Sequence, residues 1–382
     1  MMTPRARPIT LVISNIEWGF AWQRHQTLAS LFARDGDVVF CEIPGIRRVG
    51  WRDAGRIFAR LRTLGGGTKT RAGDGAAASP LPPHLRVVRP FVLPATNALF
   101  RALNARLLER FLRREPDLPK NVDLILNYSP SHSARQLIAR VPHRRLVYDC
   151  TDDWLAVRGI PACLPEDERA LLAEADLTLV PSRTLEQRKQ AHARRLVRVP
   201  HGALVERFLM ERKTRAPGEP LTLLYYGHLH AQHLDFAALD ALAQARPEWR
   251  LRLVGPVKTP HTFPPNVELA GAQPHERLRE FVAAADVLLL PYSLNEYTQA
   301  VLPAKTYECL ASGRPIVAAP LPELVADFSA HMSFASRPDE WAGAVERALA
   351  EDGSAARLAR VSLARANTWE SRYAWIRALL AD

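Results

Sequence analysis

The sequence predicts two doubly wound α/β domains, and three observations support this prediction. The chain has 382 residues, more than a single hydrophobic core usually holds. Short apolar runs alternate with amphipathic helical segments along both halves, which is the pattern of parallel sheets joined by helices. A charged stretch that contains Pro and Gly, residues 211–220, lies between the halves and is typical of a linker.

The first half contains short β-branched or apolar runs, which predict buried parallel strands, between segments of helical periodicity. The predicted strands are Ile9 to Ser14, Asp37 to Ile43, Val122 to Asn127, Leu146 to Tyr148, Ala175 to Ser182 and Val197 to Pro200. The predicted helices are Gln23 to Arg34, Trp51 to Leu64 and Ala95 to Arg114. Residues 65–80 have few bulky apolar side chains, so we expect a loop there, either a functional lid or a tolerated insertion.

An aromatic loop follows the first predicted strand. Ligand contacts in a doubly wound domain lie at the carboxyl ends of its strands. Trp18 and Phe20 are therefore expected to stack on a sugar ring, or alternatively to seal the core. Arg24 and His25 open the next helix and offer contacts to an anion or a hydroxyl. This strand is not followed by G-x-G-x-x-G, which argues against a dinucleotide oxidoreductase.

Three carboxylates follow the strand that ends at Tyr148. They are Asp149, Asp152 and Asp153. Clustered acids raise one another's pKa values, which suits a general base, and we assign that role to Asp153 or Asp152. The alternative is that Asp149 and Asp152 cap the following helix or bind backbone amides.

The second half repeats the alternation of strands and helices. Its predicted strands are Leu221 to Tyr226, Trp249 to Val254, Asn266 to Leu269, Val287 to Leu290 and Pro315 to Ala318. Its predicted helices are His233 to Arg246, Ala304 to Ala311, and three pieces between Pro338 and Asp382. One more helix is predicted after Gly271; it starts at a proline and runs through Ala284. The segment from Pro291 to Pro315 is the most informative part of this half.

Within that segment, a polar loop leads through Pro303 into a short helix that carries Lys305 and Glu308 on one face. Ligands of open α/β sheets lie beyond the strand ends, close to helix N-termini. A lysine in the first turn can contact phosphate oxygens there, and a glutamate one turn later can accept hydrogen bonds from ribose hydroxyls. The arrangement predicts a site for a nucleoside diphosphate.

The same segment resembles the nucleotide-sugar site of GT-B glycosyltransferases, especially the family 4-like branch. That branch carries Pro-x-Lys-x-x-Glu before Ala-x-Gly-x-Pro-Ile-Val, which reads here as Pro303 to Glu308 and Ala311 to Val317. The resemblance implies two Rossmann-like domains facing a central cleft, with the donor bound by the second. It implies a first domain at residues 1–205, a second at residues 206–365, and a final helix at residues 366–382 that crosses back to the first domain.

Further segments carry the resemblance or depart from it. Gly227 matches the glycine turn that holds the donor phosphates in this family, but His228 stands where an arginine is common. The resemblance implies that Lys305 stabilises the departing phosphate, that Glu308 holds the ribose, and that Tyr292 and Gly227 line the donor pocket. His228 and Pro303 complete the expected donor-binding set, in which His228 or His230 can share the neutralisation of the pyrophosphate with Lys305. The run from Tyr148 to Asp153 is similar to a Tyr-Asp-x-x-Asp-Asp segment of related transferases.

The stereochemistry of transfer depends on a second departure from the family pattern. Retaining family 4 enzymes usually carry two glutamates eight positions apart, and the residue eight before Glu308 is Ala300. We therefore favour, narrowly, an inverting hexosyltransferase in which Asp153 or Asp152 takes the acceptor proton. We expect no cofactor and no metal requirement beyond the nucleotide diphosphate sugar, because no Asp-x-Asp motif occurs.

Charge is distributed unevenly along the chain, whose formal net charge is +11. Residues 1–200 hold 32 Lys and Arg against 19 Asp and Glu, whereas residues 201–382 hold 19 against 21. The basic half suggests contact with an anionic membrane, and composition alone is the alternative. Nucleic acid is a minor option because basic and aromatic residues do not interleave.

The cysteines and the beginning of the chain bear on its location. The four cysteines lack C-x-x-C spacing, and no apolar run is long enough for a membrane helix or a signal peptide. We expect a cytoplasmic protein that binds peripherally to the inner face of the plasma membrane, with a glycan, lipid-linked or small-molecule acceptor. The alternatives are a nucleotide-sugar 2-epimerase of the same fold and a catalytically silent partner protein.

Overall fold

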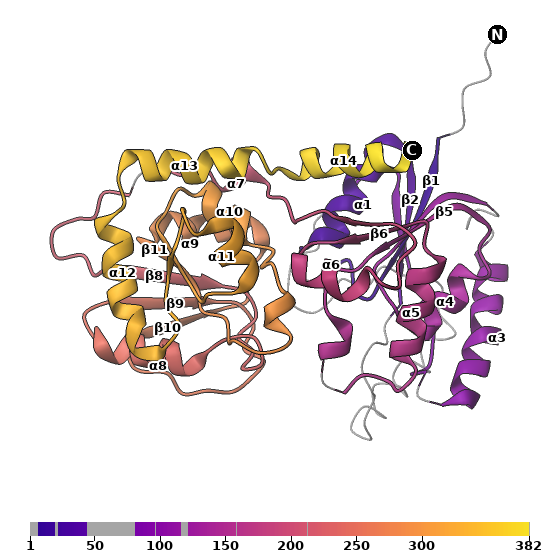
Figure 1. Ribbon diagram of the computed structural model, residues 1–382, viewed down its shortest axis with the longest axis horizontal. Helices are drawn as coiled ribbons and strands as arrows, with labels where there is room; N and C mark the ends of the chain where they lie inside the picture. The colour runs from indigo at the N-terminus through magenta and orange to yellow at the C-terminus, as the bar shows by residue number, and fades with distance from the viewer. Residues whose placement is uncertain are drawn as a thin grey trace, which may run out of the picture. The chain divides into compact units, whose positions relative to one another are not determined.

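The computed structural model of the protein describes residues 7–19, 22–43, 81–95, 97–115, 121–157, 159–211 and 213–381 (Figure 1). Phe20, the predicted helix from Trp51 to Leu64 and the predicted loop at residues 65–80 lie outside these residues. The chain divides into two compact units, one of residues 1–181 and 185–198, the other of residues 182–184 and 199–382. The division at residue 205 and the return of the last helix to the first domain stay predictions.

The first unit contains a parallel sheet of seven strands in the order β3-β2-β1-β4-β5-β6-β7. The strands are β1 (Ile9–Ser14), β2 (Asp37–Glu42), β3 (Leu85–Val88), β4 (Val122–Asn127), β5 (His143–Asp149), β6 (Leu177–Val180) and β7 (Leu196–Arg198). The helices are α1 (Arg24–Asp35), α3 (Ala98–Arg114), α4 (His132–Ile138), η3 (Trp154–Ala156), α5 (Leu164–Glu174) and α6 (Arg183–Lys189). β1 pairs with both β2 and β4, so the strand order reverses at β1.

The second unit contains a parallel sheet of six strands in the order β10-β9-β8-β11-β12-β13. The strands are β8 (Thr222–Tyr226), β9 (Arg250–Val254), β10 (Val267–Gly271), β11 (Val287–Leu290), β12 (Ile316–Ala318) and β13 (Ser333–Phe334). The helices are α7 (Val205–Phe208), α8 (Phe236–Ala245), η4 (His275–Arg277), α9 (Leu278–Ala284), η5 (Thr298–Ala300), α10 (Thr306–Ala311), α11 (Pro322–Phe328), η6 (Pro338–Glu340), α12 (Trp341–Ala350), α13 (Ser354–Arg365) and α14 (Trp369–Ala381).

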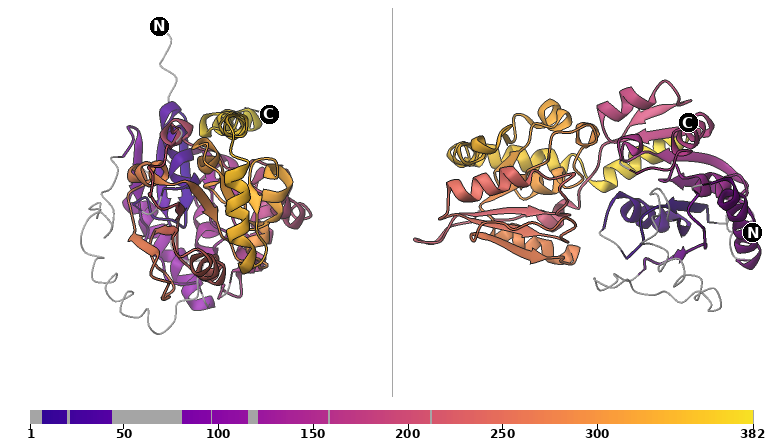
Figure 2. Two further views of the ribbon diagram at one scale, coloured as in Figure 1. Left: turned by 90° about the vertical axis from the view of Figure 1, so that its left-hand side faces the viewer. Right: turned by 90° about the horizontal axis from the view of Figure 1, so that it is seen from below.

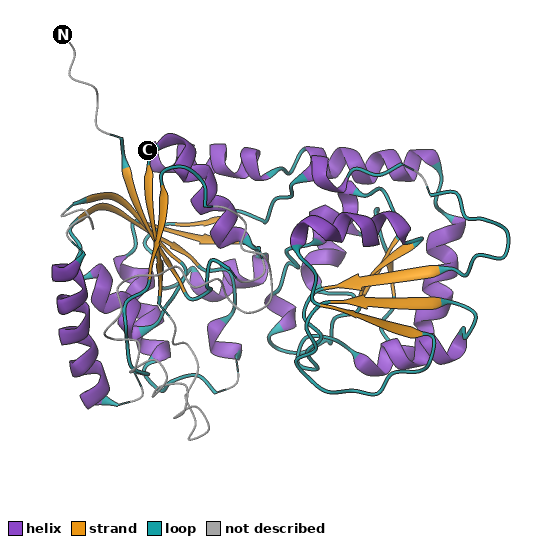
Figure 3. Ribbon diagram, turned by 180° about the vertical axis from the view of Figure 1, so that it is seen from behind, coloured by secondary structure: helices purple, strands orange, loops and turns teal. Residues whose placement is uncertain are grey.

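Helices cover both faces of the second sheet, which therefore has two apolar cores (Figures 2 and 3). Because side chains alternate along a strand, β8 contributes Leu223 and Tyr225 to one core and Leu224 and Tyr226 to the other. Burial on both faces explains why the strands read as continuous apolar runs in the sequence. The predicted doubly wound α/β class is confirmed for both units.

Two helices begin later than their periodicity suggests, because a polar residue caps each of them. Asn97 accepts a hydrogen bond from the amide of Phe100, so α3 begins at Ala98 rather than Ala95. Asp235 accepts from the amide of Ala238, so α8 begins at Phe236. Among the described helices, none is both long enough and apolar enough to span a membrane.

Candidate functional site

The second sheet reverses its strand order between β8 and β11, and the residues after these two strands form the centre of the site. Gly227 follows β8 with φ 140°, and its amide donates to the carbonyl of Val254 at 2.8 Å. A Cβ on Gly227 would lie 2.7 Å from Lys305 Nζ and 2.7 Å from the hydroxyl of Tyr225. The backbone angle therefore favours glycine here, and any larger residue would displace the ends of the Lys305 and Tyr225 side chains.

Lys305 occupies the N-cap position of α10, and its ammonium lies beside Tyr225 and Gly227 at the end of β8. Nζ donates to the hydroxyl of Tyr292 at 3.2 Å and to that of Tyr225 at 3.5 Å. It also lies 4.6 Å from the ring centroid of Tyr225, 5.7 Å from that of Tyr226 and 5.5 Å from that of Tyr292.

These tyrosines determine the charge state of Lys305. Burial lowers the pKa of an amine, but Tyr225 and Tyr292 offset this effect and raise the pKa of Lys305 above its ordinary value. The side chain is therefore a fixed positive charge at neutral pH. Its hydrogen bonds go to the hydroxyls of Tyr225 and Tyr292 and not to a carboxylate, so its charge remains available to an anion.

Glu308 lies one turn beyond Lys305, on α10. Its Oε2 accepts a hydrogen bond from the hydroxyl of Tyr226 at 3.2 Å, and its Oε1 lies 3.3 Å from Nε2 of His275. A carboxylate has about four acceptor positions, of which these contacts use two. Glu308 therefore keeps acceptor capacity for further donors, such as the two hydroxyls of a ribose.

His228 and Pro303 complete the predicted donor-side set. His228 follows Gly227, and its pKa is lowered by burial first and then by the positive charges of Lys258 and Lys305. The structure thus gathers cationic groups around the turn after β8. The carbonyl of Pro303 accepts from the amide of Thr306 at 2.9 Å, so this residue shapes the turn before α10.

Sequence reasoning missed four residues of this site: Tyr225, Tyr226, Arg207 and His275. Two adjacent tyrosines at the end of a predicted strand, directly before a glycine turn, were a usable signal for the first pair. His275 reaches Glu308 from a distant segment and Arg207 reaches His275 from another, and their local sequence carries no signal of these contacts.

In the first unit, Arg24 and Asp149 form a fully buried ion pair. Arg24 Nε donates to Asp149 Oδ2 at 2.7 Å, and their side chains are 2% and 0% exposed. Burial raises the pKa of Asp149, although Arg24 lowers it. Burial, rather than a neighbouring acid, is the main cause of this shift, and Asp149 and Asp153 have separate partners.

His25 is also buried. Its ring stacks on Tyr128 at a centroid distance of 3.7 Å, and Nδ1 lies 2.8 Å from Ser14 Oγ. Burial, and then the positive charge of Arg24, lowers the pKa of His25 to about 3. His25 is therefore neutral at physiological pH.

Trp18 lies in the core of the first unit, with an exposed fraction of 8%. Its ring packs edge-on against Trp22 and Phe40, and its amide donates to Glu42 Oε1 at 2.7 Å. These contacts match the alternative that the aromatic loop seals the core. Phe20 is outside the described residues.

The two predicted base residues have different partners. Asp153 is 4% exposed and forms ion pairs with Arg188 and, at 3.3 Å, with Lys189. Asp152 Oδ2 accepts a hydrogen bond from Thr151 at 3.1 Å. Both cations lie on α6, so the carboxylate of Asp153 links α6 to the segment after β5.

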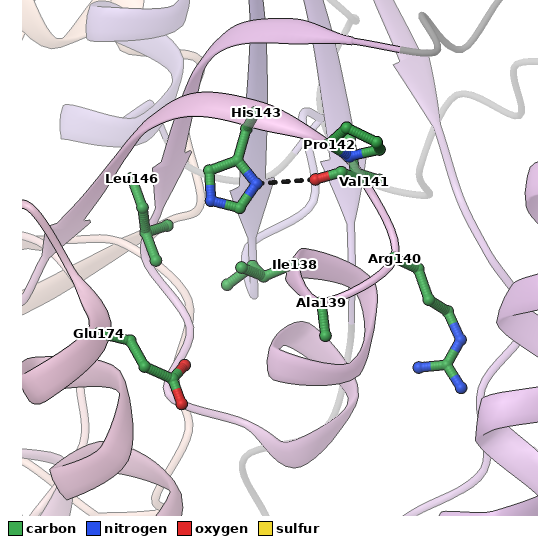
Figure 4. Close-up of a pocket in the computed structure, with 8 residues that line it drawn as sticks. All are labelled: Ile138, Ala139, Arg140, Val141, Pro142, His143, Leu146 and Glu174. Atoms are coloured by element: carbon green, nitrogen blue, oxygen red, sulfur yellow. Dashed lines mark hydrogen bonds between the residues drawn. The ribbon is translucent and has the colours of Figure 1, made fainter.

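A pocket of about 500 Å³ lies at the amino-terminal end of β5 (Figure 4). Ile138, Leu146 and Glu174 contribute to its lining, and His143 Nδ1 lies 2.7 Å from the carbonyl of Val141. Open α/β sheets bind ligands at the opposite, carboxyl ends of their strands. We therefore assign the functional site to the residues around Gly227 and Lys305.

Comparison with known proteins gives a family match over the same part of the chain. Residues 220–351 match the family model described as glycosyl transferases group 1. The match spans 132 of the 382 residues of the chain, all of them in the second unit. They contain Gly227, Tyr292, Lys305 and Glu308, so the family match covers every residue predicted on the donor side.

One curated relative and two solved structures extend the comparison. The chain is 25% identical over 256 residues to TuaH of Bacillus subtilis (strain 168), named as a teichuronic acid biosynthesis glycosyltransferase. That match covers 59% of this chain and 64% of TuaH, less than two thirds of the relative's length.

The solved structures cover nearly the whole chain. Sucrose-phosphate synthase from Thermosynechococcus elongatus is 17% identical, with a TM-score of 0.70 over 98% of both chains. HepE from Anabaena, solved in complex with UDP-glucose, is 13% identical, with a TM-score of 0.66 over 98% of this chain and 99% of that one. This likeness shows that the chain has the GT-B fold.

The prediction of inverting transfer was wrong. Group 1 glycosyltransferases of the family 4 type transfer with retention of the donor's configuration. The prediction took Ala300, in place of a glutamate, as evidence against retention, and one missing side chain does not determine stereochemistry. It also needed a carboxylate ready to accept a proton, whereas Asp153 is held by two cations.

Proposed function

We propose that the protein is a glycosyltransferase that moves a sugar from a nucleotide diphosphate sugar to an acceptor hydroxyl with retention of configuration. The observation that carries the proposal is the position of Lys305 Nζ, which lies between Tyr292 and Tyr225 beside the glycine turn after β8. A fixed cation at this edge of the sheet would stabilise the negative charge that develops on the departing diphosphate.

The donor contacts follow from the same geometry. The turn at Gly227 would present backbone amides to the diphosphate, and Glu308 would accept from the ribose hydroxyls. Lys305 and His228 would offset the diphosphate charge without a required metal ion. A uridine nucleotide is our first choice of donor, because HepE was solved with UDP-glucose.

For the acceptor, we propose a growing glycan or lipid-linked saccharide of polysaccharide biosynthesis. The naming of TuaH supports this class, as does the basic first half of the chain. In the first unit, α3 leaves Leu99 66% exposed and carries arginines at positions 101, 106, 110, 113 and 114. Such a helix would lie on an anionic cytoplasmic leaflet, where each basic side chain contributes about 1 kcal/mol.

Nucleotide-dependent thermal stabilisation tests the donor proposal, because a ligand of the native state raises the melting temperature. The purified chain is heated with UDP, GDP and their glucose, mannose and N-acetylglucosamine conjugates. A shift with one nucleotide family that is lost in Lys305→Ala supports the proposal. The absence of any shift would contradict it.

Product analysis then separates transfer from the alternative activities. With the stabilising donor and a panel of saccharide acceptors, proton NMR should show an anomeric signal of the donor's own configuration in the product. Conversion of the donor sugar to its 2-epimer would contradict the proposed reaction. Binding without turnover toward any acceptor of the panel would do so as well.

A further inference from the structure

His275 connects two charged groups of the second unit. Its Nδ1 lies 2.6 Å from Nη1 of Arg207, on α7, and its Nε2 lies 3.3 Å from Oε1 of Glu308, on α10. The three side chains form a continuous chain of polar contacts. They come from segments 68 and 33 residues away from His275, so only the fold brings them together.

The position of Arg207 determines which imidazole nitrogen carries the proton. A guanidinium has only N–H donors, so Nδ1 of His275 must be the acceptor in this contact. The remaining proton is then on Nε2, which donates to Glu308. Arg207 therefore fixes the tautomer of His275, and His275 in turn fixes one oxygen of Glu308.

Tyr226 fixes the other oxygen, and an aromatic contact holds both donors in place. The hydroxyl of Tyr226 donates to Glu308 Oε2 at 3.2 Å. The buried ring of Phe208 stacks on Tyr226 at 6.4 Å and meets His275 edge-on at 5.8 Å. Because Arg207 and Phe208 are neighbours on α7, this short helix supports both donors to Glu308.

We propose that His275 is a positioning residue for ribose recognition. Held by Arg207, it keeps the carboxylate of Glu308 in the orientation that accepts from the 2′- and 3′-hydroxyls of the nucleotide. This inference rests on the proposed function, since Glu308 contacts the ribose there. It goes beyond that function by assigning discrimination between ribose and deoxyribose to a side chain that does not touch the ligand.

Calorimetric titration with UDP and with 2′-deoxy-UDP tests the proposal. The wild-type protein should bind UDP more tightly than its deoxy analogue. In His275→Phe the affinity for UDP should fall about tenfold, as expected for the loss of a hydrogen bond to a charged group. The affinity for 2′-deoxy-UDP should fall less, because only its 3′-hydroxyl can contact Glu308. His275→Gln, which offers both an acceptor and a donor, should restore part of the discrimination.

Two further variants serve as controls. His261→Phe is matched in chemistry, and because His261 bonds to Asp240 and packs on Phe263, it should leave both affinities unchanged. Arg207→Met removes the group that fixes the tautomer and should reduce the discrimination in the same direction as His275→Phe. It provides an independent measurement if His275→Phe does not fold, as judged by circular dichroism.

The outcomes distinguish this inference from the proposed function. An equal loss of affinity for both nucleotides in His275→Phe, or no loss, would overturn the positioning role while the donor site stands. A wild-type protein that binds UDP and its deoxy analogue equally would also overturn it. If the wild-type protein binds neither nucleotide nor any other nucleoside diphosphate, the proposed function itself fails.

Discussion

Lys305 Nζ donates a hydrogen bond to the hydroxyl of Tyr292, 3.2 Å away, and so joins the turn before α10 to the residues that follow β11. The two residues are 13 positions apart in the chain. Their contact places a permanent cation where the sheet reverses its strand order. The same cation lies against the position where Gly227 has no side chain.

Gly227→Ala should therefore weaken donor binding and destabilise the second unit. The new methyl group would lie 2.7 Å from Lys305 Nζ, at a backbone angle of 140° that alanine rarely adopts. We expect a cost of about 1–3 kcal/mol. Gly343→Ala, in the interior of α12, is the matched control and should stabilise by up to about 1 kcal/mol. Equal melting temperatures for the two variants would contradict this prediction.

The stability of the first unit should fall as the pH decreases below 6.5, because of His25. Its pKa is about 3 in the folded chain against an ordinary value of 6.5, so between these values the unfolded chain binds the additional proton. Stability in that window rises with pH, by up to about 1.4 kcal/mol per unit. Melting temperatures at pH 7 and pH 5 should differ less in His25→Phe than in the wild type.

A control variant distinguishes this effect from general acid destabilisation. His192 is exposed, so His192→Gln should keep the full pH dependence of the wild-type protein. If His25→Phe retains that dependence as well, another group is responsible for it.

Nucleotide binding should take up a proton through His228. In the free protein its pKa is lowered by burial and by the nearby positive charges, so the ring is neutral at pH 7. A bound diphosphate would reverse that electrostatic balance and favour the imidazolium. Affinity should therefore increase as the pH falls toward 6. Calorimetry in buffers of different ionisation enthalpy measures the proton uptake, and His228→Asn should abolish it.

Asp153→Asn should lower stability more than it lowers donor affinity. The change leaves Lys189 and Arg188 without one carboxylate partner, and loss of a buried partner costs about 3 kcal/mol or more. Asp152→Asn should have a smaller effect, because Asp152 is only partly buried. A stable Asp153→Asn protein that binds donor but does not turn over would instead place this residue in the chemistry.

The position of Tyr292, Lys305 and Glu308 at one edge of the sheet could be predicted because its signal is local. Tyr292, Lys305 and Glu308 lie within one strand, loop and helix unit, and a loop that follows a parallel strand must open at the carboxyl edge of the sheet. The doubly wound class was predictable for the same reason, since buried parallel strands read as apolar runs.

The partners of charged side chains could not be predicted in this way. Asp149 and Asp153 are four residues apart in the sequence, yet one is bound by Arg24 from α1 and the other by Lys189 from α6. Local sequence contains no information about which distant cation reaches a carboxylate. His275 could not be predicted either, because its proposed role depends on contacts with Arg207 and Glu308, which lie in distant segments.

Tyr225 and Tyr226 connect the proposed donor site at the end of β8 to both apolar cores of the second unit. The first packs in the core beneath α8 and α12, and the second in the core beneath α9 and α10. Any nucleotide that restrains these two rings would slow the breathing motions of both layers. With nucleotide bound, amide hydrogen–deuterium exchange should then slow in the elements on both faces of the sheet, including amides far from the atoms that contact the ligand.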